Sequence, residues 1–257
     1  MKIKSDVLRK NSCLVWGLAL VFCLGVLALT APLFCRYTPY ALDEGHLLES
    51  PSMRHILGTD QLGRDVFCRL IYGARISLSI GFLVVLVASV IGIVVGTLAG
   101  YFGGVIDLLL MRFTDVMLCF PVFFLILAVA SILEPSTFHT ILILGLTGWM
   151  GQARLMRAEA LWIKTRDYVL LAQAYGLSPM RTMTRHIIPN AMGPVLVSAV
   201  LGIASAILAE SSLSFLGLGV QPPVPSWGNM LSDAKATLGV AWWMSVPPGL
   251  MLFLSIL

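Results

Sequence analysis

The sequence predicts an all-α, polytopic membrane protein with about six transmembrane helices. Only 12% of its 257 residues are charged, whereas a soluble domain carries about 25%. The mean hydropathy is +0.91, and charge-free runs long enough to cross a bilayer recur along the chain. Because a large soluble core would not leave so many such runs, the composition excludes an ordinary soluble protein.

A membrane-crossing helix needs about 20 mostly apolar residues, and six segments fit this description. They lie at 11–35, 76–106, 116–133, 135–152, 186–209 and 236–257. The first follows a basic leader but is longer than the apolar part of a typical secretion signal, so we expect an uncleaved anchor. The last runs to Leu257 without a basic residue after it, and we expect the chain to be a truncated form.

The distribution of positive charge predicts which side each loop faces. With the N-terminus inside, segments 1–10, 100–112 and 154–185 hold eleven of the 17 lysines and arginines. Cytoplasmic loops carry an excess of these residues. We therefore expect a cytoplasmic N-terminus, a cytoplasmic segment 154–190 and an extracytoplasmic loop 36–75.

The sequence lacks the motifs of several kinds of functional site. It has no phosphate-binding loop of the form G-x-x-x-x-G-K-[ST], no G-x-S-x-G nucleophile elbow and no H-E-x-x-H. Its five cysteines form no C-x-x-C pair, and its four histidines lack metal-ligand spacing. We expect no catalytic site, no cofactor and no metal in this chain. A net charge of +4 without a basic run also argues against a nucleic-acid partner.

Ionisable residues are scarce inside the predicted spans. His139 and Glu210 lie toward the predicted ends of spans, where we expect water to reach them. A proton-coupled carrier needs ionisable groups at mid-membrane, so this class of transporter is not favoured.

Four glycines, Gly92, Gly96, Gly100 and Gly104, repeat at every fourth position of the second span. On a helix they form a smooth stripe that allows close approach of a neighbouring helix. We expect this stripe to pack inside one subunit; packing against a partner subunit is the alternative.

Segment 154–190 contains, from Asp167 to Asn190, the one long polar and cationic stretch in an otherwise membrane-like sequence. Gly176 is the residue type that most often follows a helix end, Ser178 can cap a new helix, and Pro179 suits its first position. Pro189 is expected to end that short helix.

The short helix of segment 154–190 carries Met180 and Met183 together with Arg181 and Arg185. Flexible apolar side chains flanked by cations suit a protruding knob that docks in a groove of another protein. An ordinary solvated loop between two spans is the alternative.

Two motifs now indicate a family. Residues 171–176 read LAQAYG and are followed by Ile188-Pro189, which resembles the E-A-A-x(3)-G-x(9)-I-x-L-P loop of ABC importer permeases. In this chain Leu170 stands at the acidic position and Leu171 at the first alanine. The resemblance implies that the loop docks on an ATPase subunit through Ala172, Gly176, Ser178, Pro179, Met180, Arg181, Met183, Arg185 and Pro189.

The second motif is HILGTDQLGRD at residues 55–65, which continues with GARISL at 73–78. Together with RHIIPN at 185–190, LSFLGLG at 213–219 and Trp227-Gly228, it is similar to the C-type permease of dipeptide, oligopeptide and nickel importers. The likeness covers roughly residues 10–257, and relatives usually continue with a further C-terminal tail.

The 58–65 stretch of this signature has its own physical interpretation. Its glycines permit tight turns, and its charged side chains can pair locally and pin the loop to the outer face of the bundle. Contact with a substrate-binding protein and direct substrate contact are the alternatives. The residues concerned are Gly58, Thr59, Asp60, Gly63, Arg64 and Asp65.

The resemblance implies a type I ABC importer fold in a bacterial inner membrane. Residues 1–75 would form the leader, first span and extracytoplasmic loop, and residues 76–257 the permease core. The implied partners are a homologous B-type permease, two ATPase subunits that bind ATP and magnesium, an extracytoplasmic solute-binding protein and the lipid bilayer. Di- or oligopeptides are the expected substrate and nickel or a metal chelate the alternative; a non-transporting scaffold and an ion-coupled carrier are the other classes considered.

Overall fold

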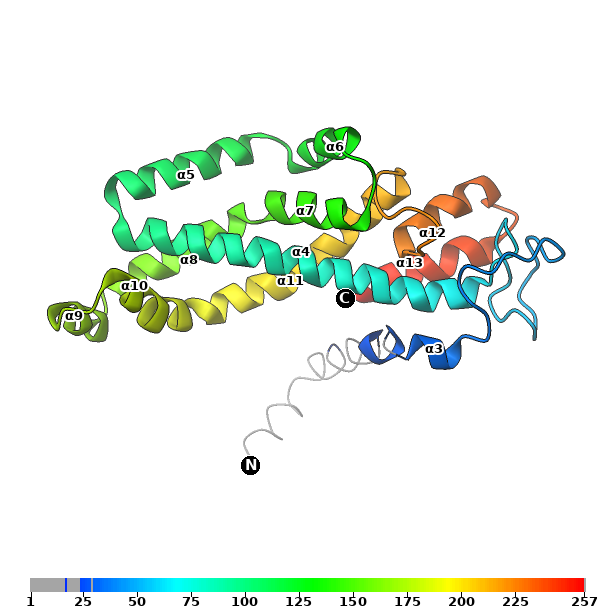
Figure 1. Cartoon of the computed structure of the whole chain (residues 1–257), viewed down its shortest axis with the longest axis horizontal. Coiled ribbons are helices and arrows are strands. Elements are labelled where there is room, and N and C mark those ends of the chain that lie inside the picture. Colours follow the sequence, from blue (N-terminus) through cyan, green and yellow to red (C-terminus); the bar gives the residue numbers. More distant parts are fainter. Residues whose placement is uncertain (1–16, 18–23, 29, 257) are drawn as a thin grey trace, which may run out of the picture. The chain divides into compact units, whose positions relative to one another are not determined.

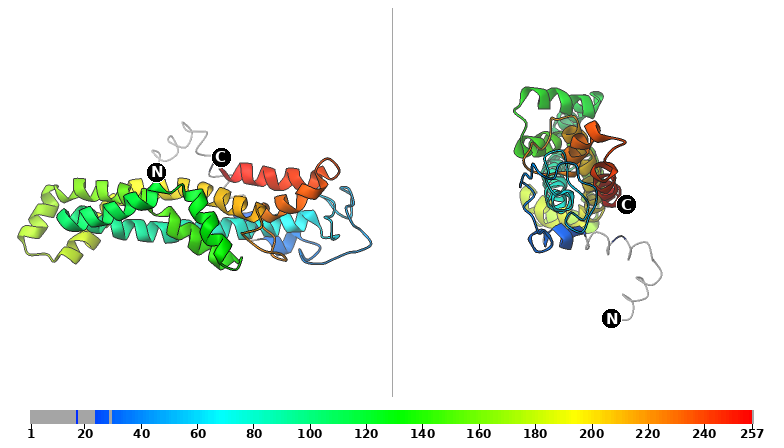
Figure 2. Two further views of the ribbon diagram at one scale, coloured as in Figure 1. Left: turned by 90° about the horizontal axis from the view of Figure 1, so that it is seen from above. Right: turned by 90° about the vertical axis from the view of Figure 1, so that its right-hand side faces the viewer.

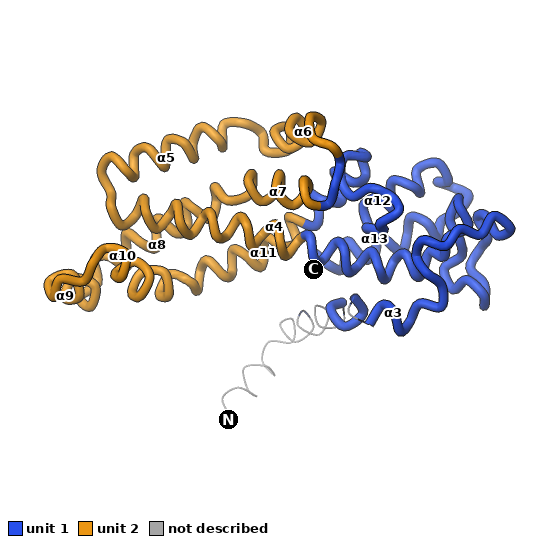
Figure 3. The backbone as a smooth tube through the Cα atoms, in the orientation of Figure 1, with its two compact units in different colours: residues 1–80, 135–137, 207–257 blue, residues 81–134, 138–206 orange. Residues whose placement is uncertain are grey.

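The computed structural model describes residues 17, 24–28 and 30–256, and within them the chain is all-helical, as predicted. It divides into two compact units, coloured separately in Figure 3. Unit 1 holds the described parts of 1–80, 135–137 and 207–257, and unit 2 holds 81–134 and 138–206. Figure 1 labels the helices: α3 (Ala31–Phe34), α4 (Val66–Phe102), α5 (Gly104–Cys119), α6 (Val122–Ile132), α7 (Thr137–Gly148), α8 (Met150–Lys164), α9 (Asp167–Ala174), α10 (Pro179–Thr182), the π-turn η1 (Met183–Ile187), α11 (Ile188–Phe215), α12 (Trp227–Ala234), the 3₁₀ turn η2 (Lys235–Thr237) and α13 (Trp242–Ile256).

Two helices of the described chain are long and apolar enough to cross a bilayer alone. They are α4 and the continuous helix Pro179–Phe215, each of 37 residues. A third crossing is possible if α5 and α6, which meet at an angle of 83°, act as one broken span. The helices α7 and α13 are apolar but shorter. The predicted span 11–35 lies mostly outside the described residues.

The helix α4 begins earlier than predicted, at Val66 rather than near residue 76. The Asp65 carboxylate accepts a hydrogen bond of 2.8 Å from the Cys68 backbone N–H, which satisfies one of the free donors of the first turn. Arg69 and Arg75, counted above as loop residues, therefore lie on the helix. The predicted boundary at residue 75 falls inside α4.

The glycine face of α4 packs on α8 within unit 2. A Cβ added at Gly92 would lie 2.8 Å from the Gln152 Cβ, and one at Gly100 would lie 2.7 Å from the Ala160 Cβ. The prediction for Gly104 is wrong: α4 ends at Phe102, and Gly103 and Gly104 have φ values of +66° and +54°. This left-handed turn, which glycine adopts without steric cost, starts α5 and removes Gly104 from the stripe.

We expect Gly96→Val to destabilise the folded chain by about 1–3 kcal/mol, the usual cost of overpacking a tight interface. The new side chain would meet the Ala153 carbonyl oxygen and the Arg157 backbone nitrogen, which cannot rotate away. Gly151→Val is the matched control, because nothing lies within 4 Å of a Cβ built at Gly151. Thermal unfolding of the purified protein in detergent measures both; equal midpoints would contradict the packing of this face.

In unit 1, the chain after α11 is held by a buried carboxylate, Glu210. Its oxygens lie 2.7 Å from the Ser214 hydroxyl and 3.4 Å from the Ser77 hydroxyl. These hydroxyls in turn accept the backbone N–H groups of Val220 and Trp227. The expectation that water reaches Glu210 is wrong, because the side chain is fully buried. Its neighbouring serines replace water as hydrogen-bond partners.

Candidate functional site

The turn at Gly176 matches the predicted helix break in segment 154–190. Gly176 has φ +80°, and its N–H donates to the Gln173 carbonyl while the N–H of Leu177 donates to the Ala172 carbonyl. This pair of bonds is the Schellman motif, which satisfies the last carbonyls of α9. The chain then turns into α10, and α9 and α10 lie together at one end of unit 2 (Figure 1; left view of Figure 2).

The start of α10 agrees with the sequence in position but not in chemistry. Ser178 is the N-cap residue and Pro179 the first helical residue. The Ser178 side chain, however, makes no capping hydrogen bond. Its backbone carbonyl instead accepts the N–H of Thr182 at 2.9 Å. Pro179 thus supplies the preset backbone angle that begins the helix.

The prediction that Pro189 ends the helix is wrong. Helix α10 continues through the π-turn η1 into α11, so that Pro179–Phe215 is one helix. Proline lacks an N–H, and its ring collides with the carbonyl four residues earlier in a regular α-helix. The wider π-turn Met183–Ile187 directly precedes the turn that holds Pro189, and its i→i+5 bonding accommodates a residue that cannot follow the α pattern.

One face of α10 and η1 is buried against the rest of unit 2. Met183 is 5% exposed, and Ile187 is fully buried. They belong to a core cluster with Met156, Ile163 and Val169 of α8 and α9. The prediction that Met183 is part of an exposed docking surface is therefore wrong. By packing in this cluster, Met183 attaches the short helix to the ends of α8 and α4.

Other side chains of segment 154–190 are exposed, and most of them are apolar. Tyr175 is 84% exposed and Met180 is 67% exposed. Arg181 and Arg185 are exposed as well, and within the described residues neither guanidinium has an ion-pair partner. We call this surface the exposed face of segment 154–190; its members are Tyr168, Leu170, Leu171, Tyr175, Met180, Arg181 and Arg185. An apolar patch flanked by cations is typical of a protein-binding surface.

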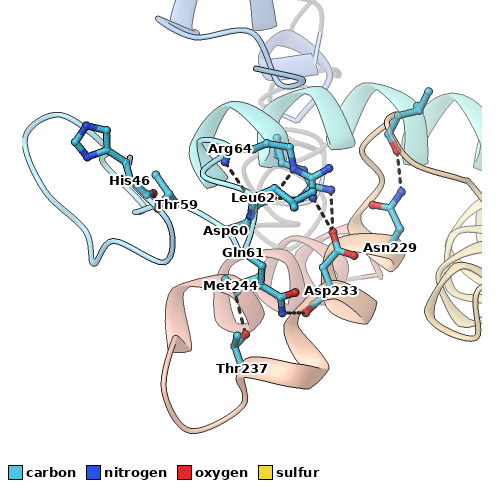
Figure 4. A network of polar contacts seen from close by, with 12 residues as sticks. His46, Thr59, Asp60, Gln61, Leu62, Arg64, Asn229, Asp233, Thr237 and Met244 are labelled. Carbon is cyan, nitrogen blue, oxygen red and sulfur yellow. Dashed lines mark hydrogen bonds and ion pairs between the residues drawn. The ribbon is translucent and has the colours of Figure 1, made fainter. Parts of the chain in front are cut away.

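In unit 1, Asp60 of the GTDQLGRD stretch is the centre of a buried ion network. One carboxylate oxygen accepts the backbone N–H groups of Leu62 and Arg64 at 2.8 and 3.0 Å. The other accepts Arg64 Nε at 2.7 Å and Arg69 Nη1. Both guanidinium groups also reach Asp233 of α12, at 3.3 and 3.0 Å (Figure 4). The structure thus brings Asp60 and Arg64 together and ties the loop to α12.

Other residues of the GTDQLGRD stretch also make contacts within the loop. Asp65 accepts a 2.9 Å hydrogen bond from the buried His55. The Thr59 hydroxyl donates to the His46 carbonyl. Gly58 and Gly63 have φ values of +70° and +74°, and a Cβ at either would collide with a backbone carbonyl oxygen. With these side chains engaged inside the loop, its role as a pin has more structural support than direct contact with a partner.

Sequence reasoning missed Arg69, Asp233 and His55 as members of these networks. Asp233 lies 169 residues along the chain from Arg64, so no local pattern could have paired them. A signal did exist for Arg69, which follows the capping residue Asp65 by one helical turn. Among the described residues, no three His, Cys, Asp or Glu side chains are grouped so as to hold a metal ion.

Comparisons with known proteins agree on one family. The family model described as "Binding-protein-dependent transport system inner membrane component" matches residues 92–257. The dipeptide transport system permease protein DppC of Alkalihalophilus pseudofirmus is 37% identical over 97% of this chain and 82% of its own length. The di/tripeptide permease DppC of Pseudomonas aeruginosa is 40% identical over 95% and 81%.

More distant matches include a solved structure. The oligopeptide permease OppC of Bacillus subtilis is 36% identical over 94% of this chain and 79% of its own length. A crystal structure of an amino acid ABC transporter with histidines covers 73% of this chain and 92% of that chain, at 16% identity and a TM-score of 0.46. That structural likeness is too distant to add to the assignment.

Proposed function

The chain belongs to the family of binding-protein-dependent transport system inner membrane components, and from this membership we propose that it is the permease subunit of an ATP-driven peptide importer. Its relatives named above are dipeptide, di/tripeptide and oligopeptide permeases. These names support peptides over nickel as the substrate. A homologous B-type permease would complete the translocation path.

The observation that carries this proposal is the exposed face of segment 154–190. A soluble ATPase subunit would cover Tyr175 and Met180, and acidic groups in its groove would pair with Arg181 and Arg185. The segment is anchored by Met183 and Ile187 in the core of unit 2, so a force on the exposed face is passed to α8 and α11. A segment that is packed in the core through some side chains and exposed through others is suited to transmit motion between subunits.

In this proposal ATP and magnesium bind to the two ATPase subunits, and this chain supplies no catalytic group. The N-terminus and segment 154–190 are cytoplasmic, and a solute-binding protein delivers peptide on the opposite side. Residues 1–75 carry the leader, first span and outer loop, and 76–257 the permease core, with α4 crossing that boundary. Transport then requires the ATPase to bind the inward-open and outward-open states with different free energies.

Reconstitution in liposomes tests the function. We expect uptake of a labelled dipeptide by the complete assembly, comprising this chain, partner permease, ATPase subunits and binding protein. Uptake should require internal ATP and persist when an ionophore collapses the proton gradient. Uptake that follows the proton gradient without ATP would identify a carrier instead. An assembly that binds the ATPase but moves no peptide would favour a scaffold.

A further inference from the structure

Helices α5 and α8 of unit 2 face each other through charged side chains. Arg157 of α8 binds Asp107 of α5 in a two-pronged ion pair, with distances of 2.5 and 2.6 Å. This partner raises the pKa of the Arg157 guanidinium above its ordinary value. A second pair joins Arg154 to Asp115 at 2.7 Å. Arg154 and Arg157 belong to segment 154–190, which is cytoplasmic in the function proposed above, so these charged pairs are expected at the water-facing end of the bundle rather than in lipid.

An open groove of about 390 Å³ lies beside these ion pairs. We call it the charged groove; it is lined by Gly104, Asp107, Leu108, Met111, Arg112, Asp115 and Arg157. Arg112 differs from the other charged residues because it is exposed and has no ion-pair partner in the described part of the chain. Within the described chain, the groove therefore holds one cation without an ion-pair partner, Arg112, beside two carboxylates that are already in ion pairs, Asp107 and Asp115.

The remaining surface of α5 has the opposite character. Leu109, Phe113 and Val116 are exposed and do not line the groove. An apolar face suits lipid or the apolar surface of a neighbouring helix, whereas the charged face suits water and a polar solute. The helix is thus two-sided, and the groove lies on its polar side.

We propose that the charged groove is part of the peptide translocation path, and that Arg112 binds the carboxylate of the passing peptide. This inference rests on the function proposed above. A free peptide carries an ammonium and a carboxylate group, and the groove carries both signs of charge. Arg112 can pair with the carboxylate without breaking an existing ion pair, and a guanidinium holds a carboxylate through two parallel hydrogen bonds.

Adjacent leucines of α5 provide a matched test. Leu108 lines the groove and is 55% exposed, whereas Leu109 is 64% exposed and lies outside it. A photo-crosslinking amino acid is placed at either position in the complete reconstituted importer, which is illuminated while it takes up a radiolabelled dipeptide. We expect label on the chain with the probe at Leu108, at least about tenfold above the chain with the probe at Leu109. Equal labelling, or more at Leu109, overturns the proposal.

Substitution of Arg112 separates this role from general packing. We expect Arg112→Gln to lower the maximal uptake rate at least about tenfold, the effect of losing one charge-assisted hydrogen bond. Arg112→Lys, which keeps the cation but not the two parallel hydrogen bonds, should give a rate between those of Arg112→Gln and the wild type. Both variants should still copurify with the other subunits, because Arg112 is exposed. Equal uptake rates in the Arg112→Gln and Arg112→Lys variants overturn the proposal that Arg112 binds the peptide carboxylate.

The two proposals fail in different ways. If wild-type protein takes up no dipeptide, the proposed function fails as well. If wild-type protein takes up dipeptide but the label shows no preference for Leu108, only the proposal for the charged groove is overturned.

Discussion

Replacing Asp60 by alanine is expected to destabilise unit 1 by about 3–5 kcal/mol, the cost of removing one partner from a buried ion pair. The Asp60 side chain is almost fully buried, and its two oxygens accept four hydrogen bonds. Arg69 is buried too, and its Nε atom has no hydrogen-bond partner among the described residues. Without Asp60, the two arginines would share only one oxygen of Asp233.

The matched control for Asp60→Ala is Asp43→Ala in the same loop. The Asp43 side chain is 42% exposed and lies 4.0 Å from Arg54, whose side chain is 54% exposed, and such a surface pair contributes no more than about 1 kcal/mol. Thermal unfolding of the purified complex and protease resistance of the loop measure both variants. Similar losses in the two variants, or none in Asp60→Ala, would show that the ion network does not pin the loop.

Gly176→Val is expected to uncouple ATP hydrolysis from transport while leaving the chain folded. Gly176 has φ +80°, a conformation that costs other residues roughly 1–2 kcal/mol and a β-branched residue such as valine more. Nothing lies within 4 Å of a Cβ built there, so the damage comes from the backbone alone. The turn would open and move α9 relative to α10, which distorts the exposed face. Gly176→Asn is the control, since asparagine tolerates this conformation.

The exposed residues Arg181 and Arg185 provide a second test of coupling to the ATPase. Charge reversal at Arg181 and Arg185 should weaken ATPase binding at least about tenfold, because like charges brought together at an interface cost several kcal/mol. Uptake of dipeptide and stimulation of ATPase turnover by the binding protein are measured together for all variants. Wild-type values in Gly176→Val and in the charge-reversed protein would refute the coupling role.

Local patterns in the sequence predicted local structure well. The glycines at 92, 96 and 100 share a helix face, and that face packs on α8. Gly176 ends α9 as its residue type predicts, because a left-handed turn is set by a single residue and its neighbours. The helical class and the family likewise followed from composition and short motifs. These features depend on residues a few positions apart.

Features that depend on distant residues could not be predicted. The partner of Arg64 on α12 and the partners of Asp107 and Asp115 on α8 are brought close only by the fold. Met183 lies only three residues after Met180, yet Met183 is core and Met180 is exposed, because only Met183 joins the cluster formed with α8 and α9, and that contact is set by the packing of distant elements. The prediction that Pro189 ends the helix was wrong for a related reason, because a preceding π-turn allows a helix to continue through proline.

The central claim is that segment 154–190 is cytoplasmic and docks on the ATPase subunit. The most direct test measures from which side of the membrane residue 175 is accessible and whether the bound ATPase protects it. Tyr175→Cys is made in a chain whose five native cysteines are replaced, and is treated with a membrane-impermeant thiol reagent in right-side-out and inverted vesicles, with and without the ATPase subunits. Met183→Cys serves as the buried control. We expect reaction only from the cytoplasmic side, and protection when the ATPase is bound. Reaction from the outer side, or equal reaction with the ATPase present, would contradict a docking role for segment 154–190.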